Sequence, residues 1–395
     1  MIKVVGPVCN LDCDYCYYLE KEALYPGKKF NLSSFRMDEE VLEKFIRDYI
    51  TSQPQERIEF IWHGGEPSLL GVDYFRKAFQ LQQKYANGKM IANVFQTNGT
   101  LMNDLWAEFL AENQVLCGLS IDGPRKFHDE HRRFLNGEGS WEKAVACARL
   151  FQKHGVEFNT MSVVNASNCR EPLAVYEFLK EIGSHFMQFS PIVERIALDE
   201  TERLSIVNNN YTKETAVMQE NVGDIEWGNF LCRIFDHWVK TDVGSYYVNW
   251  FDNTLAAYVG QIPSLCSMAP YCGCSMAVEH NGDVYCCDHF VFPEYKLGNV
   301  LEHPIVELAK SDRQLYFEQN KKDTLSARCC SCAYLNVCGG DCPKNRFAKT
   351  EEGERISCLC KGFRMYFEHT RKYFEFMSNE LKNQRPPANV MRAKI

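Results

Sequence analysis

The sequence predicts an α/β fold: a partial (β/α)6 TIM-like barrel followed by a cysteine-rich domain. Two observations support this. Strand-like runs alternate with amphipathic helical stretches in the first half of the chain, and most of the 19 cysteines lie in two dense zones. The chain has 395 residues, of which 45% are hydrophobic, so it can bury a large core.

Six short apolar runs are typical of β-strands, and they cover residues 2–6, 58–63, 91–98, 117–122, 158–164 and 186–193. Between them lie amphipathic stretches such as 140–155, where Ser140 can cap the start of a helix and Gly155 can end it. Strands that alternate with helices form parallel sheets, and right-handed crossovers curve such units into an open barrel. Functional residues are therefore expected at the C-terminal ends of the strands.

The alternation ends near residue 196, and we divide the chain into four predicted parts. The barrel, a connector with a helical segment, the cysteine-rich domain, and a C-terminal helix with its tail are expected over residues 1–195, 196–260, 261–361 and 362–395. The polar run 199–214 is typical of a connector, and the last residues, from 383, are expected to form a loose tail.

The charge pattern and the hydropathy exclude several classes of function. The net charge is −8 and the acidic and basic residues are interspersed, whereas a nucleic-acid-binding face needs clustered Lys and Arg. No apolar run approaches the length of about 18 residues that crosses a bilayer, and no export leader opens the chain. We therefore expect no nucleic-acid or membrane partner and a cytoplasmic location. In that reducing compartment the dense cysteines indicate metal ligation rather than disulfides.

The first cysteine zone is the stretch CNLDCDYC, in which Cys9, Cys13 and Cys16 form a CxxxCxxC pattern directly after the first strand. Three thiolates can hold three irons of a cubane cluster and leave the fourth iron open to a ligand. A structural zinc ion would need a fourth Cys or His nearby, and none follows closely. The pattern favours an open iron–sulfur cluster, with zinc as the alternative.

This pattern, with Tyr15 before the last cysteine, resembles the radical S-adenosylmethionine (SAM) superfamily. The resemblance implies that the open iron binds the amino and carboxylate groups of S-adenosyl-L-methionine, and that reduction then yields a 5′-deoxyadenosyl radical. The motif GGEP at residues 64–67 resembles the glycine-rich segment that meets the methionine end of that cofactor. Glycine lets a backbone approach a ligand closely. A simple tight turn is the alternative interpretation of this motif.

The second cysteine zone resembles the SPASM domain, a C-terminal extension with two auxiliary 4Fe–4S clusters. The resemblance implies three 4Fe–4S clusters in total, one open and two with four ligands each. It assigns the first auxiliary cluster to Cys266, Cys272, Cys287 and Cys342, and the second to Cys329, Cys332, Cys338 and Cys360. Cys286 and Cys358 are neighbours of assigned ligands and compete with them. A pair of zinc ribbons is the alternative for this zone.

The stretch YCCDHFV at 285–291, together with QTNGT at 96–100 and GLSIDGP at 118–124, resembles the anaerobic sulfatase-maturating enzymes. That resemblance implies post-translational oxidation of a Cys or Ser in an unfolded or nascent sulfatase to Cα-formylglycine. Asp288 would be the catalytic proton acceptor, and a flavodoxin- or ferredoxin-type donor of low potential would supply electrons. A structural carboxylate that caps backbone amides is the alternative role for Asp288.

Position by position, the resemblance also implies which residues contact the SAM cofactor: Tyr15, Gly65, Ser120, Arg132 and Val193. An Arg can bind a carboxylate with two parallel hydrogen bonds. Two further residues are noted. Tyr18 lies near the family's active site or is a core aromatic, and His63 stands before GGEP where a relative carries Gln.

Two other functions remain open at this point. Another radical SAM/SPASM peptide modifier would form a thioether or carbon–carbon crosslink in a short precursor peptide. Such enzymes often have a peptide-recognition domain before the barrel, whereas this chain is expected to begin on its first barrel strand. A non-enzymatic iron–sulfur electron carrier or a zinc-binding module is the second alternative, but neither uses a three-cysteine site beside GGEP.

Overall fold

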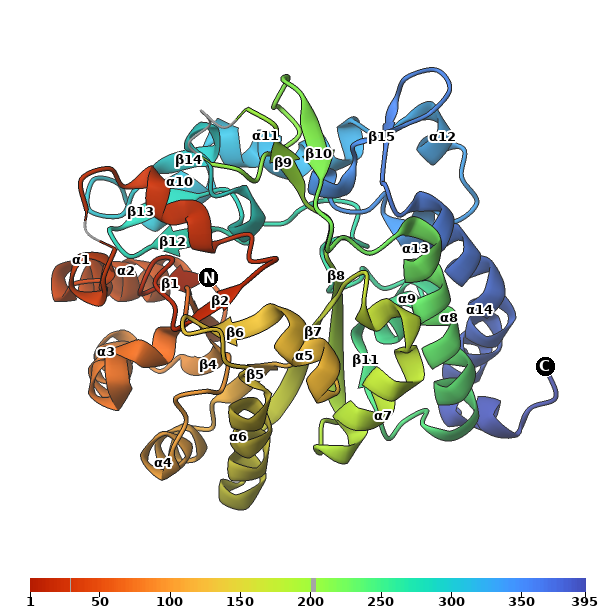
Figure 1. The fold of residues 1–395 in the computed structure, drawn as a ribbon, viewed down its shortest axis with the longest axis horizontal. Helices are drawn as coiled ribbons and strands as arrows, with labels where there is room; N and C mark the ends of the chain where they lie inside the picture. Colours follow the sequence, from red (N-terminus) through yellow and green to blue (C-terminus); the bar gives the residue numbers. More distant parts are fainter. Residues whose placement is uncertain (29, 200–203) are drawn as a thin grey trace.

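The computed structural model describes residues 1–28, 30–199 and 204–395. A curved sheet lies in the centre, helices cover its outer side, and the cysteine-rich region lies across one end of it (Figure 1). This is the predicted α/β class. Among the described residues no helix is both long and apolar enough to span a bilayer.

The central sheet has ten strands in the order β11-β8-β7-β5-β4-β3-β1-β12-β13-β14. Six of them match the predicted barrel strands, and they run parallel to their neighbours: β1 Ile2–Lys3, β3 Arg57–His63, β4 Met90–Thr97, β5 Leu116–Ser120, β7 Phe158–Val164 and β8 Phe186–Pro191. The first strand is shorter than predicted because the chain turns at Gly6, whose φ of 53° lies in the left-handed region that glycine tolerates.

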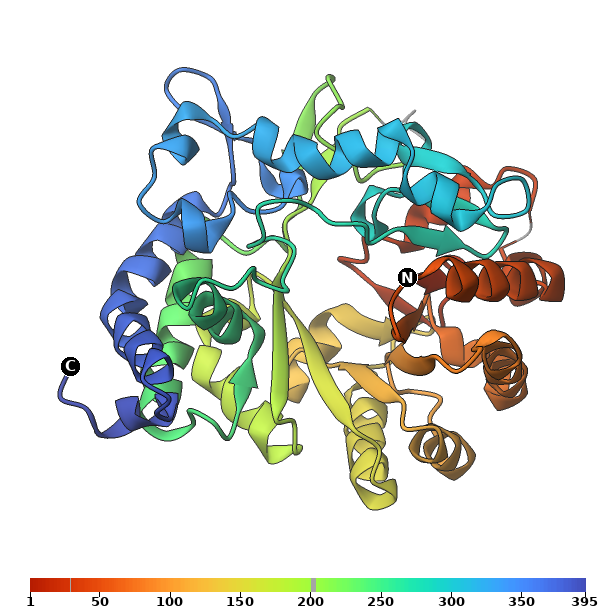
Figure 2. The same cartoon turned by 180° about the vertical axis from the view of Figure 1, so that it is seen from behind.

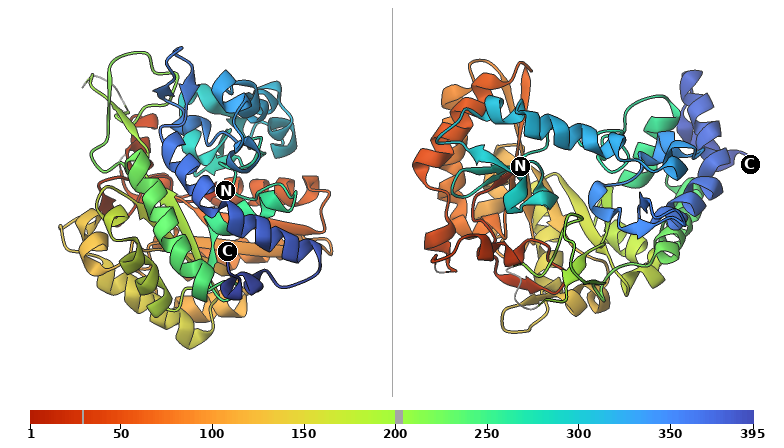
Figure 3. Two further views of the ribbon diagram at one scale, coloured as in Figure 1. Left: turned by 90° about the vertical axis from the view of Figure 1, so that its right-hand side faces the viewer. Right: turned by 90° about the horizontal axis from the view of Figure 1, so that it is seen from above.

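The cysteine-rich region extends this same sheet. Its strand β12 pairs in parallel with β1, and an antiparallel hairpin then adds the last two strands: β12 Ala277–Glu279, β13 Asp283–Tyr285 and β14 Lys296–Asn299. The tight turn before β13 requires Gly282, whose φ is 87°. The two regions lie side by side, with the red N-terminal segments next to the cyan hairpin (Figure 3).

Amphipathic helices cover the outer side of the barrel: α2 Glu39–Ser52, α3 Gly71–Tyr85, α4 Asp104–Glu112, α6 Trp141–His154, α7 Pro172–Glu181 and α8 Asp224–Thr241. Asp38 caps α2 by accepting a hydrogen bond from Val41 N at 2.9 Å. Gly155 ends α6 in a left-handed conformation, as predicted. Ser140 lies at the N-cap of α6, but its hydroxyl donates to the Arg132 carbonyl at 2.8 Å instead of capping the helix.

The remaining elements complete the described chain. The helices and turns are η1 Leu19–Leu24, α1 Leu32–Phe35, η2 Pro67–Leu70, α5 Arg125–His131, η3 Asn168–Arg170, α9 Asn249–Tyr258, η4 Asp288–Phe290, η5 Pro293–Tyr295, α10 Ile305–Ala309, α11 Asp312–Asp323, α12 Ala327–Cys330, α13 Leu335–Cys338, η6 Pro343–Asn345, α14 Cys360–Lys382 and η7 Pro387–Arg392. The strands are β2 Leu11–Cys13, β6 Arg132–Phe134, β9 Arg195–Ala197, β10 Thr215–Val217, β11 Tyr247–Val248, β15 Ala348–Lys349 and β16 Arg355–Ile356.

The part predicted as a connector contains more structure than expected. Strands β9 and β10 pair as an antiparallel hairpin, and α8 and α9 follow where helices were expected. Residues 200–203 of the polar run lie outside the described residues. The tail is also ordered, contrary to the prediction: η7 packs back on α14 and α8, Val390 is buried, and Glu380 of α14 pairs with Arg385 and Asn389.

Helices α8 and α14 lie along each other at the edge of the fold, where the green and blue helices run together (Figure 2). Two glycines allow their close approach. A Cβ atom on Gly228 would lie 2.6 Å from the Gly362 carbonyl oxygen, and one on Gly362 would lie 2.0 Å from the Asp224 carbonyl oxygen. Backbone atoms cannot move aside as a flexible side chain can. The close contact of α8 and α14 therefore requires glycine at positions 228 and 362.

We expect Gly228→Ala to lower the free energy of unfolding by about 1–3 kcal/mol, because the methyl group forces the helices apart. Asn229→Ala is the matched control, since Asn229 is exposed on the same helix, and it should change stability by less than about 0.5 kcal/mol. Anaerobic denaturant unfolding followed by circular dichroism measures both. Equal stability of the two variants would contradict the close packing of α8 and α14.

Candidate active site

The three-cysteine loop lies over the C-terminal end of β1. Within it, β2 pairs with β6, so that Cys13 stands opposite Arg132. Two N–H groups are directed at the Cys9 sulfur: Leu11 N lies 3.4 Å from it and Asn98 Nδ2 lies 3.8 Å from it. Burial raises the pKa of the Cys9 thiol to about 12. Such a thiolate needs a metal cation for its charge, so three grouped thiols with N–H donors fit an iron–sulfur cluster.

The GGEP segment is packed directly against this loop. Gly65 N donates to the Gly6 carbonyl at 2.7 Å, and Glu66 N donates to the Val8 carbonyl at 3.0 Å. A Cβ atom on Gly65 would lie 2.0 Å from the Val8 carbonyl oxygen, so no larger residue fits here. The segment is therefore more than an isolated turn, because its backbone holds the residues that lead into Cys9.

Glu66 of this segment is buried and joins it to the end of β4. Its carboxylate accepts hydrogen bonds from the Ser68 hydroxyl at 2.5 Å, the Thr97 hydroxyl at 2.9 Å and Asn98 N at 2.8 Å. Asn98 in turn reaches Asn10 of the cysteine loop at 3.0 Å. The motifs GGEP and QTNGT thus form one hydrogen-bonded network behind the three cysteines.

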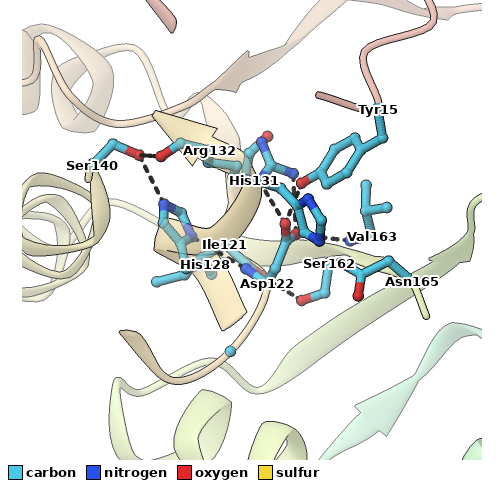
Figure 4. Close-up of polar contacts among 12 residues, drawn as sticks. Tyr15, Ile121, Asp122, His128, His131, Arg132, Ser140, Ser162, Val163 and Asn165 are labelled. Atoms are coloured by element: carbon cyan, nitrogen blue, oxygen red, sulfur yellow. Dashed lines mark hydrogen bonds and ion pairs between the residues drawn. The ribbon is translucent and has the colours of Figure 1, made fainter. Parts of the chain in front are cut away.

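Tyr15 and Arg132, both predicted to contact the cofactor, meet at a buried carboxylate (Figure 4). Arg132 donates from Nε and Nη2 to the two oxygens of Asp122, at 2.9 and 3.1 Å, and the Tyr15 hydroxyl donates to the same group. Burial acts to raise the pKa of Asp122, but the Arg132 guanidinium holds it below its usual range. Two of the three guanidinium nitrogens of Arg132, Nε and Nη2, are therefore bound to Asp122. The third nitrogen of Arg132, Nη1, is left for a further ligand.

The sequence prediction missed Asp122, although it lies in the motif SIDGP at the end of β5. It is fully buried and also accepts a hydrogen bond from Val163 N at 2.9 Å. Ser120, two residues earlier, accepts from Gln96 Nε2 at 2.9 Å. The remaining predicted cofactor contact, Val193, is buried after β8, and its carbonyl accepts from Lys344 Nζ at 2.9 Å.

A second buried network surrounds Asp288, which begins η4 directly after Cys287. One oxygen of Asp288 forms an ion pair with Lys3, and the other accepts the Tyr17 hydroxyl at 2.5 Å. Lys3 is fully buried, and its Nζ also lies 3.2 Å from His63 Nδ1 and 4.1 Å from the centre of the Tyr18 ring. Residues from β1, β3 and the cysteine-rich hairpin thus converge on one carboxylate.

The electrostatics of this network are set by Lys3. Burial acts to raise the pKa of Asp288, but the Lys3 ammonium holds it below its usual range. Asp288 is therefore a carboxylate at neutral pH. Burial and the charge of Lys3 lower the pKa of His63 to about 3, so its ring is neutral.

Sequence analysis missed Lys3, Tyr17 and Glu279 as members of this network. Lys3 stands next to His63 of β3 and Glu279 of β12 in the strand register. Glu279 is buried and accepts the Tyr18 hydroxyl at 2.6 Å, which accounts for Tyr18 as a buried, hydrogen-bonded residue. A lysine within an apolar first strand was the available signal, because a buried ammonium requires a partner.

Several cysteines of the predicted auxiliary sites lie close enough to influence one another's pKa. Burial raises the pKa of Cys287, and its neighbours Cys342 and Cys266 raise it further, while Cys266 acts likewise on Cys272. In the second predicted set, Cys360 and Cys329 both add to the raised pKa of Cys338, and Cys329 and Cys332 act on Cys360. These neighbours are compatible with the two sets of four, which stay a prediction.

The two ambiguous neighbours lie in different surroundings. Cys286 is buried in an apolar cluster with Phe290 and Phe317. Cys358 lies near Asp341 and Lys344, and its pKa is raised chiefly by burial. Among residues 1–28, 30–199 and 204–395, no three Cys, His, Asp or Glu side chains converge as they would on a single metal ion.

Two buried cations lie beside the loop that carries Cys266. The Lys321 side chain is fully buried, and its Nζ donates to the carbonyls of Cys266 at 2.5 Å and Ser267 at 2.9 Å, and to that of Ala269. Arg346 is buried beside it and donates to the Lys321 carbonyl at 2.6 Å. Both cations hold the loop that carries Cys266, and neither was singled out from the sequence.

Comparison with known proteins agrees with this geometry. Residues 4–179 match the radical SAM superfamily, and residues 266–333 match the SPASM iron–sulfur cluster-binding domain. The chain is 49% identical over 394 residues to the serine-type anaerobic sulfatase-maturating enzyme of Bacteroides thetaiotaomicron, covering 100% of this chain and 94% of that protein. It is 30% identical over 386 residues to the cysteine-type enzyme of Clostridium novyi, covering 96% of this chain and 97% of that protein.

A solved structure leads to the same family. The structure of native anSMEcpe with bound AdoMet and Cp18Cys peptide matches with a TM-score of 0.82 and 29% identity, and the match covers 96% of this chain and 98% of that one. The Streptococcus suis SuiB structure with S-adenosylmethionine matches at a TM-score of 0.56 and 16% identity, which shows a shared fold. The chain belongs to the anaerobic sulfatase-maturating enzymes, which are radical SAM enzymes with a SPASM iron–sulfur domain.

Proposed function

We propose that this enzyme oxidises the active-site Cys or Ser of an unfolded or nascent sulfatase polypeptide to Cα-formylglycine, with Asp288 as the proton acceptor. The observation that carries this proposal is the buried ion pair between Lys3 and Asp288, which holds a carboxylate beside the three-cysteine loop. The names of the relatives, which are serine-type and cysteine-type maturases, support the choice of substrate.

We propose three 4Fe–4S clusters as cofactors. Cys9, Cys13 and Cys16 would hold the open cluster, and the two groups of four cysteines would hold the auxiliary ones. Tyr15, Gly65, Ser120, Arg132 and Val193 would surround S-adenosylmethionine. With these groups bound, the cofactor supplies a 5′-deoxyadenosyl radical that removes one hydrogen atom from the target Cβ.

Oxidation of the serine –CH2–OH group to an aldehyde removes two hydrogens. One would leave Cβ as a hydrogen atom, and the other would leave the hydroxyl as a proton that Asp288 accepts. An auxiliary cluster held by the proposed cysteine ligands would take up the remaining electron. A thiol substrate loses the same two hydrogens and forms a thioaldehyde, which water hydrolyses to the aldehyde with release of hydrogen sulfide. A carboxylate has about four acceptor positions, so a substrate hydroxyl can donate to Asp288 alongside Lys3 and Tyr17.

A donor of low potential, of the flavodoxin or ferredoxin type, would supply electrons. Exposed Cys332, a proposed ligand of the second auxiliary cluster, supports electron exchange at that surface. We place the enzyme in the cytoplasm because its thiols are free and its proposed clusters require reducing conditions.

Two synthetic peptides test the function, one with Cys and one with Ser in the same sulfatase-like context. The reconstituted enzyme, with S-adenosylmethionine and a strong reductant under anaerobic conditions, should convert at least one of them to the formylglycine mass. Formation of 5′-deoxyadenosine without any peptide oxidation would contradict the proposed substrate.

Replacement of the proposed base tests its role. Asp288→Asn should slow formylglycine formation at least about 100-fold while iron content is retained, because general base catalysis typically contributes a factor of this size. Asp283→Asn is the matched control, since Asp283 lies in the same hairpin but pairs with Lys296. Mass spectrometry follows the peptide, and unchanged oxidation by Asp288→Asn would remove the residue from this role.

Iron analysis tests the cluster assignment. The intact enzyme should contain about twelve irons per chain, four for each cubane. Joint replacement of Cys9, Cys13 and Cys16 by Ala should leave about eight irons and abolish cleavage of S-adenosylmethionine. Cys232→Ala, which removes a thiol of the hydrophobic core, should keep the full iron content. About four irons in the intact enzyme would show that the second cysteine zone does not hold clusters.

A further inference from the structure

The ring of His63 has one nitrogen held by the protein and one without a partner among the described residues. Lys3 Nζ lies 3.2 Å from Nδ1, and Gly64 N donates to the same atom at 2.8 Å. The Gly64 carbonyl oxygen also lies 3.1 Å from Nδ1. A proton on Nδ1 would face two donors, Lys3 Nζ and Gly64 N. Their repulsion outweighs a single hydrogen bond from Nδ1 to the Gly64 carbonyl. The neutral ring therefore carries its proton on Nε2.

His63 lies at the end of the barrel that carries the candidate site. His63 is the last residue of β3, at the end of the barrel where the three-cysteine loop and GGEP lie. It is half-buried, and no described side chain accepts from its Nε2. Lys3 joins its other nitrogen to Asp288, so the ring and the carboxylate are held at a fixed separation by one ammonium group.

We propose that His63 is a specificity-determining residue that favours a serine target over a cysteine target, by donating its Nε2–H to the substrate hydroxyl oxygen. This inference rests on the proposed function. Lys3 is the positioning residue: it fixes the tautomer of His63 and the orientation of Asp288 through one group. The hydroxyl would donate its proton to Asp288 and accept the N–H of His63, so that both of its hydrogen-bonding roles are filled.

The preference follows from the difference between oxygen and sulfur. A hydroxyl oxygen is a good acceptor, whereas sulfur is a weak one, so the N–H of His63 stabilises the serine substrate more. As the hydroxyl proton moves to Asp288, negative charge grows on the oxygen, and a fixed donor at that point lowers the barrier further. A thiol loses its proton more readily, with an ordinary pKa of about 8.5, so it depends less on the donor.

Two variants at this position separate hydrogen bonding from packing. His63→Leu removes the donor while retaining an apolar side chain, and His63→Gln restores an N–H of similar reach. We expect His63→Leu to lower kcat/KM for the Ser peptide about tenfold more than for the Cys peptide, a difference that corresponds to about 1.4 kcal/mol. His63→Gln should recover most of the Ser/Cys ratio of the natural enzyme. An unchanged ratio in His63→Leu, or equal ratios in the two variants, would overturn the proposal.

A binding measurement with the natural enzyme gives a second test that needs neither turnover nor a variant. Fluorescence anisotropy under anaerobic conditions compares the Ser peptide with one that has Ala in its place. A hydrogen-bonded hydroxyl should give about fivefold tighter binding of the Ser peptide. Equal affinities would overturn the role of His63. If the natural enzyme oxidises neither peptide, the proposed function fails. If it oxidises both peptides but replacement of His63 leaves the Ser/Cys ratio of kcat/KM unchanged, only this inference fails.

Discussion

The buried ion pair between Lys3 and Asp288 is the contact on which the geometry of the candidate site depends. Each of these charges would be costly in the protein interior alone, so removal of one leaves the other uncompensated. The pair joins the first strand of the barrel to a turn of the cysteine-rich region, 285 positions apart in the chain. It also brings Tyr17 and His63 into contact with the same two groups.

This contact is possible because the two regions share one sheet. The parallel pairing of β1 with β12 continues the barrel strands into the hairpin, and the hairpin then delivers Cys287 and Asp288 to the mouth of the barrel. The proposed ligand of an auxiliary cluster and the proposed base are consecutive residues. In the proposed mechanism, a substrate at the barrel mouth would lie between the source of the radical and an acceptor for the proton and the electron.

The six barrel strands could be predicted from the sequence because their apolar runs are local and alternate with amphipathic helices. The radical SAM and SPASM regions could be predicted because the spacing of their cysteines is characteristic. The pairing of Arg132 with Asp122, and of Lys3 with Asp288, depends on contacts between distant segments that no local pattern records. Ser140 does not cap α6 because its backbone is already helical, with a ψ of −3°, instead of extended as an N-cap requires. The tail proved ordered because Glu380 and buried Val390 anchor it.

The pairing of β1 with β12 has a consequence for biosynthesis. The second residue of the chain finds its strand partner at Val278, so most of the polypeptide must leave the ribosome before the first strand has both neighbours. Until then one edge of the barrel sheet is open, and the Lys3 ammonium has no counter-ion. Contacts between such distant segments form slowly, and an open sheet edge in the meantime favours association with other chains. Incomplete synthesis would therefore yield a half-barrel that is prone to aggregation rather than a working fragment.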